Sequence, residues 1–178
     1  MKLRLLSLVL LLFVFCVPAN AQVDISKIRV DTTPVKNEKD LVNQSTLVVY
    51  GWPNSADEEY PTGQTVEQFK LVNFVQTFHV KQSLKGTSSP LIRIVTTGTD
   101  PLPKPPNPLN KVYPGPLAEG NYLCFLRKLP GTDLYTIVGG WQGVYPYLDG
   151  KFIALQDSGF PKFHGLTIQQ AEQLIKQM

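Results

Sequence analysis

The stretch Thr46-Leu47-Val48-Val49-Tyr50-Gly51 combines β-branched, aliphatic and aromatic residues in a single short run. Side chains of these kinds pack well on a pleated surface, so the run predicts a β-strand. A second run, Asn121-Tyr122-Leu123-Cys124-Phe125-Leu126, is apolar on both alternating faces, which is typical of a strand buried on both sides. Together the two runs predict the centre of a mainly β domain.

Three further strands and a hairpin are predicted outward from these runs. Residues 66–84 alternate between an apolar face, with Phe74, Phe78 and Val80, and a polar face, with Asn73, Thr77, His79 and Lys81. Asp149-Gly150 separates residues 144–148 from residues 151–155 and is the strongest hairpin signal in the chain. The predicted fold is an antiparallel barrel of about five strands, at residues 46–51, 66–84, 91–96, 121–128 and 134–139, extended by this hairpin.

Helices are expected at both ends of the domain. Asn37 is placed to cap a short helix that runs through Asn43, because its side chain accepts hydrogen bonds from the first free amides. Thr167 and Gln170 form a capping-box pattern, and apolar residues recur at helical spacing from there to Lys176. We expect this second helix to lie on the sheet through Ile168, Ala171 and Ile175.

Two segments are predicted as loops. Residues 52–65 contain Pro53, Asn54, Pro61 and Gly63, which favour turns and interrupt strands. Seven prolines fall between Pro101 and Pro116, and each proline lacks the backbone donor that a sheet interior needs. We expect this proline-rich segment to be a stiff surface loop that joins two strands. The alternative is a polyproline II segment that docks on a partner.

The N-terminus has the three parts of a secretion signal. Lys2 and Arg4 precede the apolar run 5–17, and Ala19-Asn20-Ala21 supplies small residues for cleavage before Gln22. We therefore expect residues 1–21 to be a signal peptide, with a buried N-terminal helix as the alternative. The mature chain is expected to be secreted, monomeric and without a stable membrane anchor, with a flexible arm at residues 22–36 and a single domain at residues 37–178.

Composition excludes several classes of protein. Of 178 residues, 43% are hydrophobic, which is too large a share for a disordered chain. The formal charge of +3 falls to +1 without Lys2 and Arg4, so we expect no nucleic-acid partner.

Removal of residues 1–21 leaves Cys124 as the single cysteine, which rules out an internal disulfide. Its strand predicts a buried and unreactive thiol, and a catalytic nucleophile is the alternative.

The motifs of known catalytic and metal sites are not found in the sequence. His79 and His164 lie outside any metal-ligand spacing, and we interpret the carboxylate run Asp57-Glu58-Glu59 as a solvated loop. The nucleophile elbow and the glycine-rich phosphate loops do not occur either. No catalytic residue, metal or cofactor is therefore predicted.

Aromatic side chains in the predicted loops are the best candidates for binding. Trp52 and Tyr60 belong to residues 52–63 and Tyr113 belongs to the proline-rich segment. Side chains of this kind give a large contact area at low entropic cost, so we expect these three to anchor a partner. The alternative is that Trp52 and Trp141 fill the edges of the core.

Four segments resemble the netrin-like module, which tissue inhibitors of metalloproteinases carry and which secreted bacterial proteins of unassigned function resemble. They are residues 45–51, 78–86, 92–95 and 117–123, with Leu84-Lys85-Gly86 and Gly120-x-Tyr122-Leu123 as the most specific parts. The resemblance implies an OB-type barrel of about five strands, a scaffold that carries many unrelated functions.

The mature N-terminus departs from this family. In the inhibitors, a cysteine at the first mature position chelates the zinc of the protease, whereas this chain is expected to begin Gln22-Val23-Asp24. No inhibitory residue is therefore carried over. The preferred hypothesis is a secreted, non-enzymatic binding module for a protein or a cell-surface polymer. The alternative is a protease inhibitor or a small hydrolase of unrecognised type that uses His79 or His164.

Overall fold

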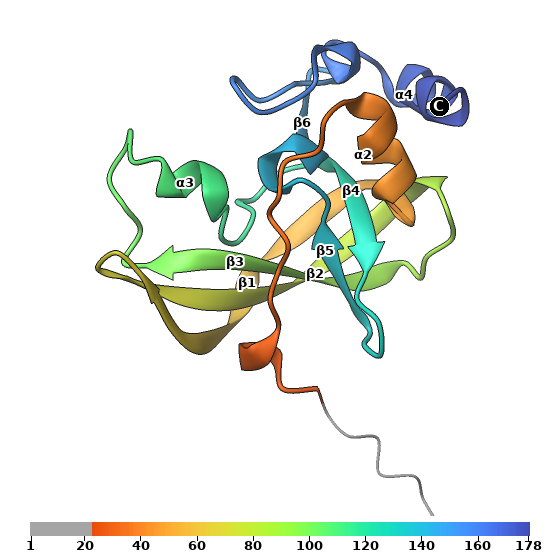
Figure 1. The fold of residues 1–178 in the computed structure, drawn as a ribbon. Coiled ribbons are helices and arrows are strands. Elements are labelled where there is room, and N and C mark those ends of the chain that lie inside the picture. The colour runs from red at the N-terminus through yellow and green to blue at the C-terminus, as the bar shows by residue number, and fades with distance from the viewer. Residues whose placement is uncertain (1–22) are drawn as a thin grey trace, which may run out of the picture.

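The computed structural model describes residues 23–178, and the predicted signal peptide at residues 1–21 lies outside the described residues. The strands are β1 (Leu47–Val66), β2 (Phe69–Lys85), β3 (Leu91–Asp100), β4 (Tyr122–Lys128), β5 (Leu134–Ile137), β6 (Val144–Leu148) and β7 (Lys151–Phe152). The helices are α2 (Glu38–Gln44), α3 (Leu109–Val112) and α4 (Ile168–Lys176), with 3-10 turns η2 (Ile25–Lys27), η3 (Gly140–Gly143) and η4 (Pro161–Phe163). The described chain is mainly β, as the sequence predicts (Figure 1).

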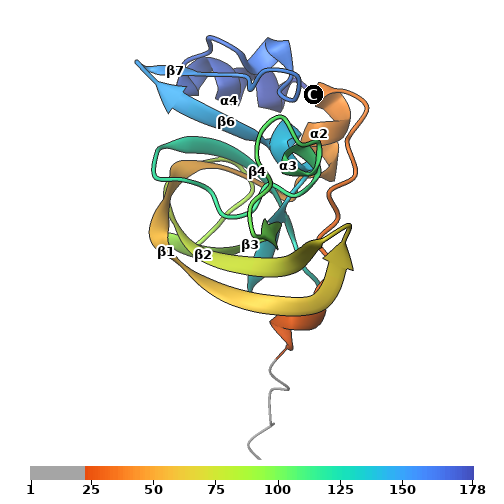
Figure 2. The same ribbon diagram turned by 90° about the vertical axis from the view of Figure 1, so that its left-hand side faces the viewer.

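Five strands close a ring in the order β1–β2–β3–β5–β4, because β4 pairs with β1 again. The long, curved strands β1 and β2 form one wall of it (Figure 2). The prediction of a wholly antiparallel arrangement is wrong at one pair, since β3 and β5 are parallel. The reason is geometric: strand directions cannot alternate all the way around a ring with an odd number of strands.

The β1–β2 hairpin is longer than predicted, because residues 52–65, expected as a loop, belong to β1. β4 pairs with β1 over Leu47–Gly51, so Pro53 and Pro61 lie beyond that pairing, where a missing backbone donor costs no ladder bond with β4. The register with β2 shifts between Pro53 and Asp57, which accommodates the extra residues as a bulge.

Two large apolar clusters lie on the two faces of β1 and β4. The inner cluster draws side chains from all strands of the ring and includes Val49, Phe78 and Cys124, which is fully buried as predicted. The outer cluster contains Val48 and Tyr50 and also takes side chains from α2, α4 and the β6–β7 hairpin. Figures 1 and 2 show these covering elements together at one end of the ring.

Both helices expected at the ends of the domain are confirmed, and so are their caps. Asn37 accepts a hydrogen bond of 2.9 Å from the Asp40 amide at the start of α2. Thr167 and Gln170 form the predicted capping box of α4, whose Ala171 is completely buried. The hairpin at Asp149-Gly150 is also confirmed, although its second strand, β7, ends at Phe152.

The N-terminal segment predicted as a flexible arm lies along the domain from η2 to α2 (Figures 1 and 2). Asn73 of β2 donates from its side-chain amide to the carbonyl oxygens of Ile25 and Ile28, at 2.9 and 2.8 Å. Asp31 forms an ion pair of 3.1 Å with Arg127 of β4. These polar contacts hold the arm against the ring at two separate points.

The proline-rich segment joins β3 to β4 as a loop, as predicted, and contains the short helix α3. Trp141 in η3 donates from its indole nitrogen to the Asn110 carbonyl at 2.9 Å. Gly115 donates from its backbone to the Thr97 carbonyl at 3.1 Å. Leu117, near the end of the loop, is buried in the inner cluster. The second half of the loop, from Asn110 to Leu117, is therefore attached to η3 and to the ring.

Candidate functional site

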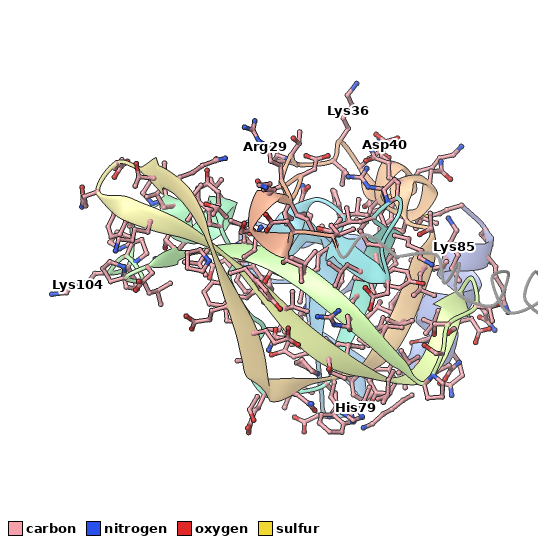
Figure 3. All side chains as sticks on the ribbon, turned by 90° about the horizontal axis from the view of Figure 1, so that it is seen from below. Arg29, Lys36, Asp40, His79, Lys85 and Lys104 are labelled. Atoms are coloured by element: carbon pink, nitrogen blue, oxygen red, sulfur yellow. The ribbon has the colours of Figure 1, made fainter. Side chains whose placement is uncertain are left out.

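Two aromatic rings stack on the surface of the ring of strands, Trp52 from β1 and His79 from β2. The two residues stand opposite each other in the strand pairing, and their ring centroids are 3.8 Å apart with planes inclined by 2°. Trp52 keeps 38% of its surface exposed. Figure 3 shows His79 at the surface, on the side of the molecule opposite Arg29 and Lys36. We call this pair the Trp52–His79 platform.

Trp52 is exposed because the layer that covers β1 ends beside it. Val48, Tyr50 and Trp52 share the outer face of β1, and their exposed fractions rise from 0% through 9% to 38%. The Tyr50 ring packs edge-on against Tyr147 of the β6–β7 hairpin, with centroids 4.9 Å apart. The platform therefore continues a buried apolar row beyond the edge of its cover.

Gly51 lets the two strands approach closely beside the platform. A Cβ atom at this position would lie 2.0 Å from the His79 carbonyl oxygen and 2.7 Å from the Phe78 ring. Both distances are far shorter than van der Waals contact, so any side chain here would push β2 away from β1. Glycine is thus required for the strand separation at which the two rings stack.

Polar contacts hold the platform from the side of the proline-rich loop. His79 Nε2 lies 2.8 Å from Asn54 Oδ1, and because an amide oxygen only accepts, this partner assigns the proton to Nε2. The Asn54 carbonyl in turn accepts from Gln76 Nε2 at 3.0 Å. Gln76 is buried, and its amide also bonds both backbone groups of Leu117. One glutamine therefore links the bulge in β1 to the end of the loop.

A cation lies next to the platform on the same outer face. The exposed Lys81 donates from its ammonium to Asn121 Oδ1 at 2.8 Å and lies 5.6 Å from the centroid of the Tyr50 ring. Burial and the neighbouring Tyr147 raise the pKa of Tyr50, so its hydroxyl stays a neutral hydrogen-bonding group. We name this surface the aromatic ledge; it consists of Tyr50, Trp52, His79, Lys81 and Tyr147.

Tyr60, the second predicted anchor, lies in a different place. Its hydroxyl donates to the Glu58 carboxylate, and this hydrogen bond raises the pKa of Tyr60. Arg93 pairs with Glu58 and with Asp133, each at 3.3 Å, along a polar groove of about 820 Å³. Tyr60 also packs on a small apolar cluster formed by β2, β3 and β5, so it serves partly as a core residue.

Tyr113, the third predicted anchor, belongs to yet another region. It lines a small hollow of about 200 Å³ together with residues of the N-terminal arm and of β1–β3. Trp52, Tyr60 and Tyr113 therefore do not converge on one site. Trp141, for which a role at the core edge was the alternative, packs against the inner cluster.

His164 and Cys124, the other residues considered for catalysis, make contacts within the fold. His164 Nδ1 accepts from the Ala154 amide at 3.3 Å. Burial raises the pKa of the Cys124 thiol. Among the described side chains of residues 23–178, no three His, Cys, Asp or Glu are placed to hold a metal ion. Within the same range, no helix has the length and apolar character to cross a membrane.

Sequence reasoning missed His79 and Lys81 as neighbours of Trp52 in the aromatic ledge. Their place on the polar face of β2 is predicted from alternation, but their position beside Trp52 depends on the strand register. That register shifts between Tyr50 and Gly51, where β2 has one more residue than β1. No signal in the sequence locates such a bulge.

No protein-family model, curated protein or solved structure matches this chain.

Proposed function

We propose that this protein is a secreted, non-enzymatic binding module whose ligand lies on the aromatic ledge. The observation that carries the proposal is the exposed Trp52 indole, stacked on His79 at 3.8 Å. Tryptophan is among the residues most enriched in the anchoring positions of binding sites. A ring already fixed in one orientation loses little further entropy on binding, which favours affinity.

The size of the exposed apolar surface favours a polymer over a protein as the ligand. The exposed Leu91 of β3 stands opposite His79 in the strand pairing, so the apolar surface beside Trp52 is a short row across three strands. The other large hydrophobic side chains exposed among residues 23–178 belong to other elements: Val23, Leu102, Val112 and Leu148. A stable protein interface buries about 800 Å² on each side around a contiguous apolar centre. A sugar ring needs only one aromatic face, because its weakly positive C–H groups pack against the negative π-surface. We therefore infer a cell-surface polysaccharide as the ligand.

The ring of strands supports this proposal through its architecture. We propose that it is an OB-type barrel, because five strands of mixed direction close through pairing of β1 with β4. Barrels of this type bind oligosaccharides or oligonucleotides on one face and its neighbouring loops. We also propose that the domain is related to the netrin-like module, a relationship that agrees with secretion and with a binding role.

The hydrolase alternative gains no specific support from the surroundings of the two histidines. A general base of this kind needs a carboxylate or a hydroxyl within hydrogen-bond reach. His79 instead meets the amide of Asn54 and the indole of Trp52. His164 accepts from a backbone amide.

Pull-down on insoluble polysaccharides tests the proposal. The mature protein, beginning at Gln22, is mixed with particles of several cell-surface and extracellular polysaccharides, and the bound fraction is measured. We expect at least one polysaccharide to retain the wild type, and Trp52→Ala to reduce the affinity at least about tenfold, since an anchor of this size contributes about 1.5 kcal/mol or more.

Tyr113→Ala is the matched control, because it removes another aromatic ring away from the ledge, and it should bind like the wild type. Retention that survives Trp52→Ala would show that the ledge is not the site. Failure of every polysaccharide, together with Trp52-dependent capture of an extracellular protein, would replace the polymer with a protein partner.

A further inference from the structure

We infer that the aromatic ledge selects an acidic polysaccharide, in which the carboxylate of a uronic acid pairs with Lys81 while its sugar ring lies on Trp52. This inference rests on the proposed function and specifies the ligand of that same site. Three observations support it: the position of Lys81, its hydrogen bond to Asn121 and the charges around it.

Lys81 is directed along the ledge by the irregular pairing of β1 and β2. Tyr50 pairs with Gln82 while Gly51 pairs with Val80, so Lys81 is the extra residue of a bulge. A bulge re-aims the side chain it carries. The Lys81 ammonium consequently lies over the Tyr50 ring, at 5.6 Å from the centroid.

The ammonium is held in place but retains binding capacity. One of its three protons goes to Asn121 Oδ1 at 2.8 Å, and the other protons remain available for a ligand. Tyr50 and Trp52 are alternate residues on one face of β1, and such positions are about 7 Å apart. The positive charge over Tyr50 is therefore displaced along β1 from the indole of Trp52.

That arrangement fits the shape of a uronic acid. Its carboxylate extends outward from the edge of the sugar ring, so a ring that lies flat on an indole directs the charge sideways. A cation to the side can then make a charge-assisted hydrogen bond while the ring stays in contact with the aromatic face. An unsubstituted neutral sugar leaves Lys81 without an anionic partner.

The charges near Lys81 also favour an anion. Lys81 takes part in none of the ion pairs found among residues 23–178. The carboxylate that meets the adjacent Gln82 is Glu172, at 3.2 Å, and Glu172 is already paired with Lys176 at 2.6 Å. The ledge thus presents a positive charge that no described carboxylate neutralises by contact.

Titration calorimetry with matched polymers tests the inference. The probes are oligomers of polygalacturonate, alginate and hyaluronate, each compared with a derivative whose carboxylates are methyl-esterified. We expect at least one acidic oligomer to bind, its ester to bind several-fold more weakly, and the affinity to fall as salt is raised. Lys81→Gln should weaken binding of the acidic oligomer by about fivefold and leave binding of its ester unchanged.

Lys36→Gln is the matched control, because it makes the same charge change on the side of the molecule opposite His79 (Figure 3). It should leave the affinity unchanged, whereas equal loss in both variants would show unspecific charge attraction and overturn the inference. Failure of all three acidic oligomers would also overturn it. If neutral polysaccharides bind as tightly and Trp52→Ala removes that binding, the inference fails while the proposed function stands. If no binding depends on Trp52, the proposed function fails as well.

Discussion

The buried side chain of Gln76 forms two hydrogen bonds with the backbone of Leu117. Its Oε1 accepts from the Leu117 amide at 2.7 Å, and its Nε2 donates to the Leu117 carbonyl at 2.9 Å. The same Nε2 group donates to Asn54 at 3.0 Å. Asn54 in turn meets His79, the partner of Trp52. The aromatic platform and the proline-rich loop are therefore connected through Asn54 and Gln76.

Replacement of Gln76 should loosen the platform as well as lower stability. We expect Gln76→Met to lower the free energy of unfolding by about 2 kcal/mol, because it leaves buried backbone groups of Leu117 and Asn54 unpaired. Since the chain has two tryptophans, a Trp141→Phe background makes Trp52 the sole tryptophan, whose fluorescence can be excited selectively. Acrylamide should then quench Trp52 more strongly in the Gln76→Met variant. Urea denaturation measures the stability change.

Gln142→Met is the control for this experiment. Gln142 also bonds both backbone groups of a distant residue, Val35, but it lies in η3. Its loss should lower stability without a change in the quenching of Trp52. An equal rise in the quenching of Trp52 in both variants would mean that Gln76 has no particular connection with the platform.

Two of the predicted aromatic anchors should differ in what they contribute to stability. Trp52 belongs to neither of the large core clusters, so Trp52→Ala should shift the Tm by less than about 2 °C. Tyr60 packs on a small cluster with Val75 and Leu134, so Tyr60→Ala should lower the Tm by about 3 °C. Differential scanning calorimetry of both variants measures these shifts. A larger decrease of the Tm for Trp52→Ala than for Tyr60→Ala would show that the Trp52 side chain belongs to the core.

The Cys124 thiol should be inert in the folded protein. It is fully buried and burial raises its pKa, so the reactive thiolate is disfavoured. A thiol reagent should label it slowly in buffer and rapidly in denaturant. Cys124→Ala should lower the stability by about 1 kcal/mol through the small cavity it leaves, with binding unaffected. Rapid labelling of the native protein would contradict the buried strand.

Acid should release the middle of the N-terminal arm. Hydrogen bonds from Thr33, and then Arg127, hold the pKa of Asp31 below its usual value. A carboxyl group whose folded pKa is lowered stabilises the fold above the unfolded pKa of about 4, and this contribution is lost as the pH falls through the folded value. The Asp31 side chain is 52% exposed, so screening keeps the contribution below about 1 kcal/mol.

Hydrogen exchange of the amides around Asp31 measures this release. Protection should fall below about pH 4, after correction for the intrinsic exchange rate, in the wild type. In Asp31→Asn it should be low throughout and insensitive to pH. Asn73 holds the Ile25 and Ile28 carbonyls without a titrating group, but Asp24 accepts from the Ser26 amide and its pKa is also lowered. The Ser26 amide should therefore lose protection in acid in both proteins.

Much of the fold follows from local patterns in the sequence. The apolar runs that begin at Thr46 and Asn121 become the paired strands β1 and β4. The capping box at Thr167 and the turn at Asp149-Gly150 also act locally, through side chains and backbone within a few residues of each other. Such signals can be predicted because their physical cause lies in the same short stretch of chain.

The errors arose where distant segments decide the outcome. Pro53 and Pro61 indicate a loop on local grounds, yet both belong to β1 because they pair with β2. Proline is tolerated there because the pairing of β1 with β4 ends at Gly51. Asn73 belongs to the polar face of β2 but is buried by the N-terminal arm, whose carbonyls it satisfies. The partners of Trp52 likewise depend on a register that no single segment specifies.

The closure of the ring has a consequence for the order of folding. β1 and β2 are joined by a tight turn at Glu67, so their hairpin can assemble within microseconds. Closing the ring brings Leu47 to Leu126, about 80 residues away along the chain, and the entropy lost in forming so long a loop delays that step. The Trp52–His79 pair belongs to the early hairpin. We therefore expect the nascent chain to expose its stacked rings before the rest of the domain has assembled around them.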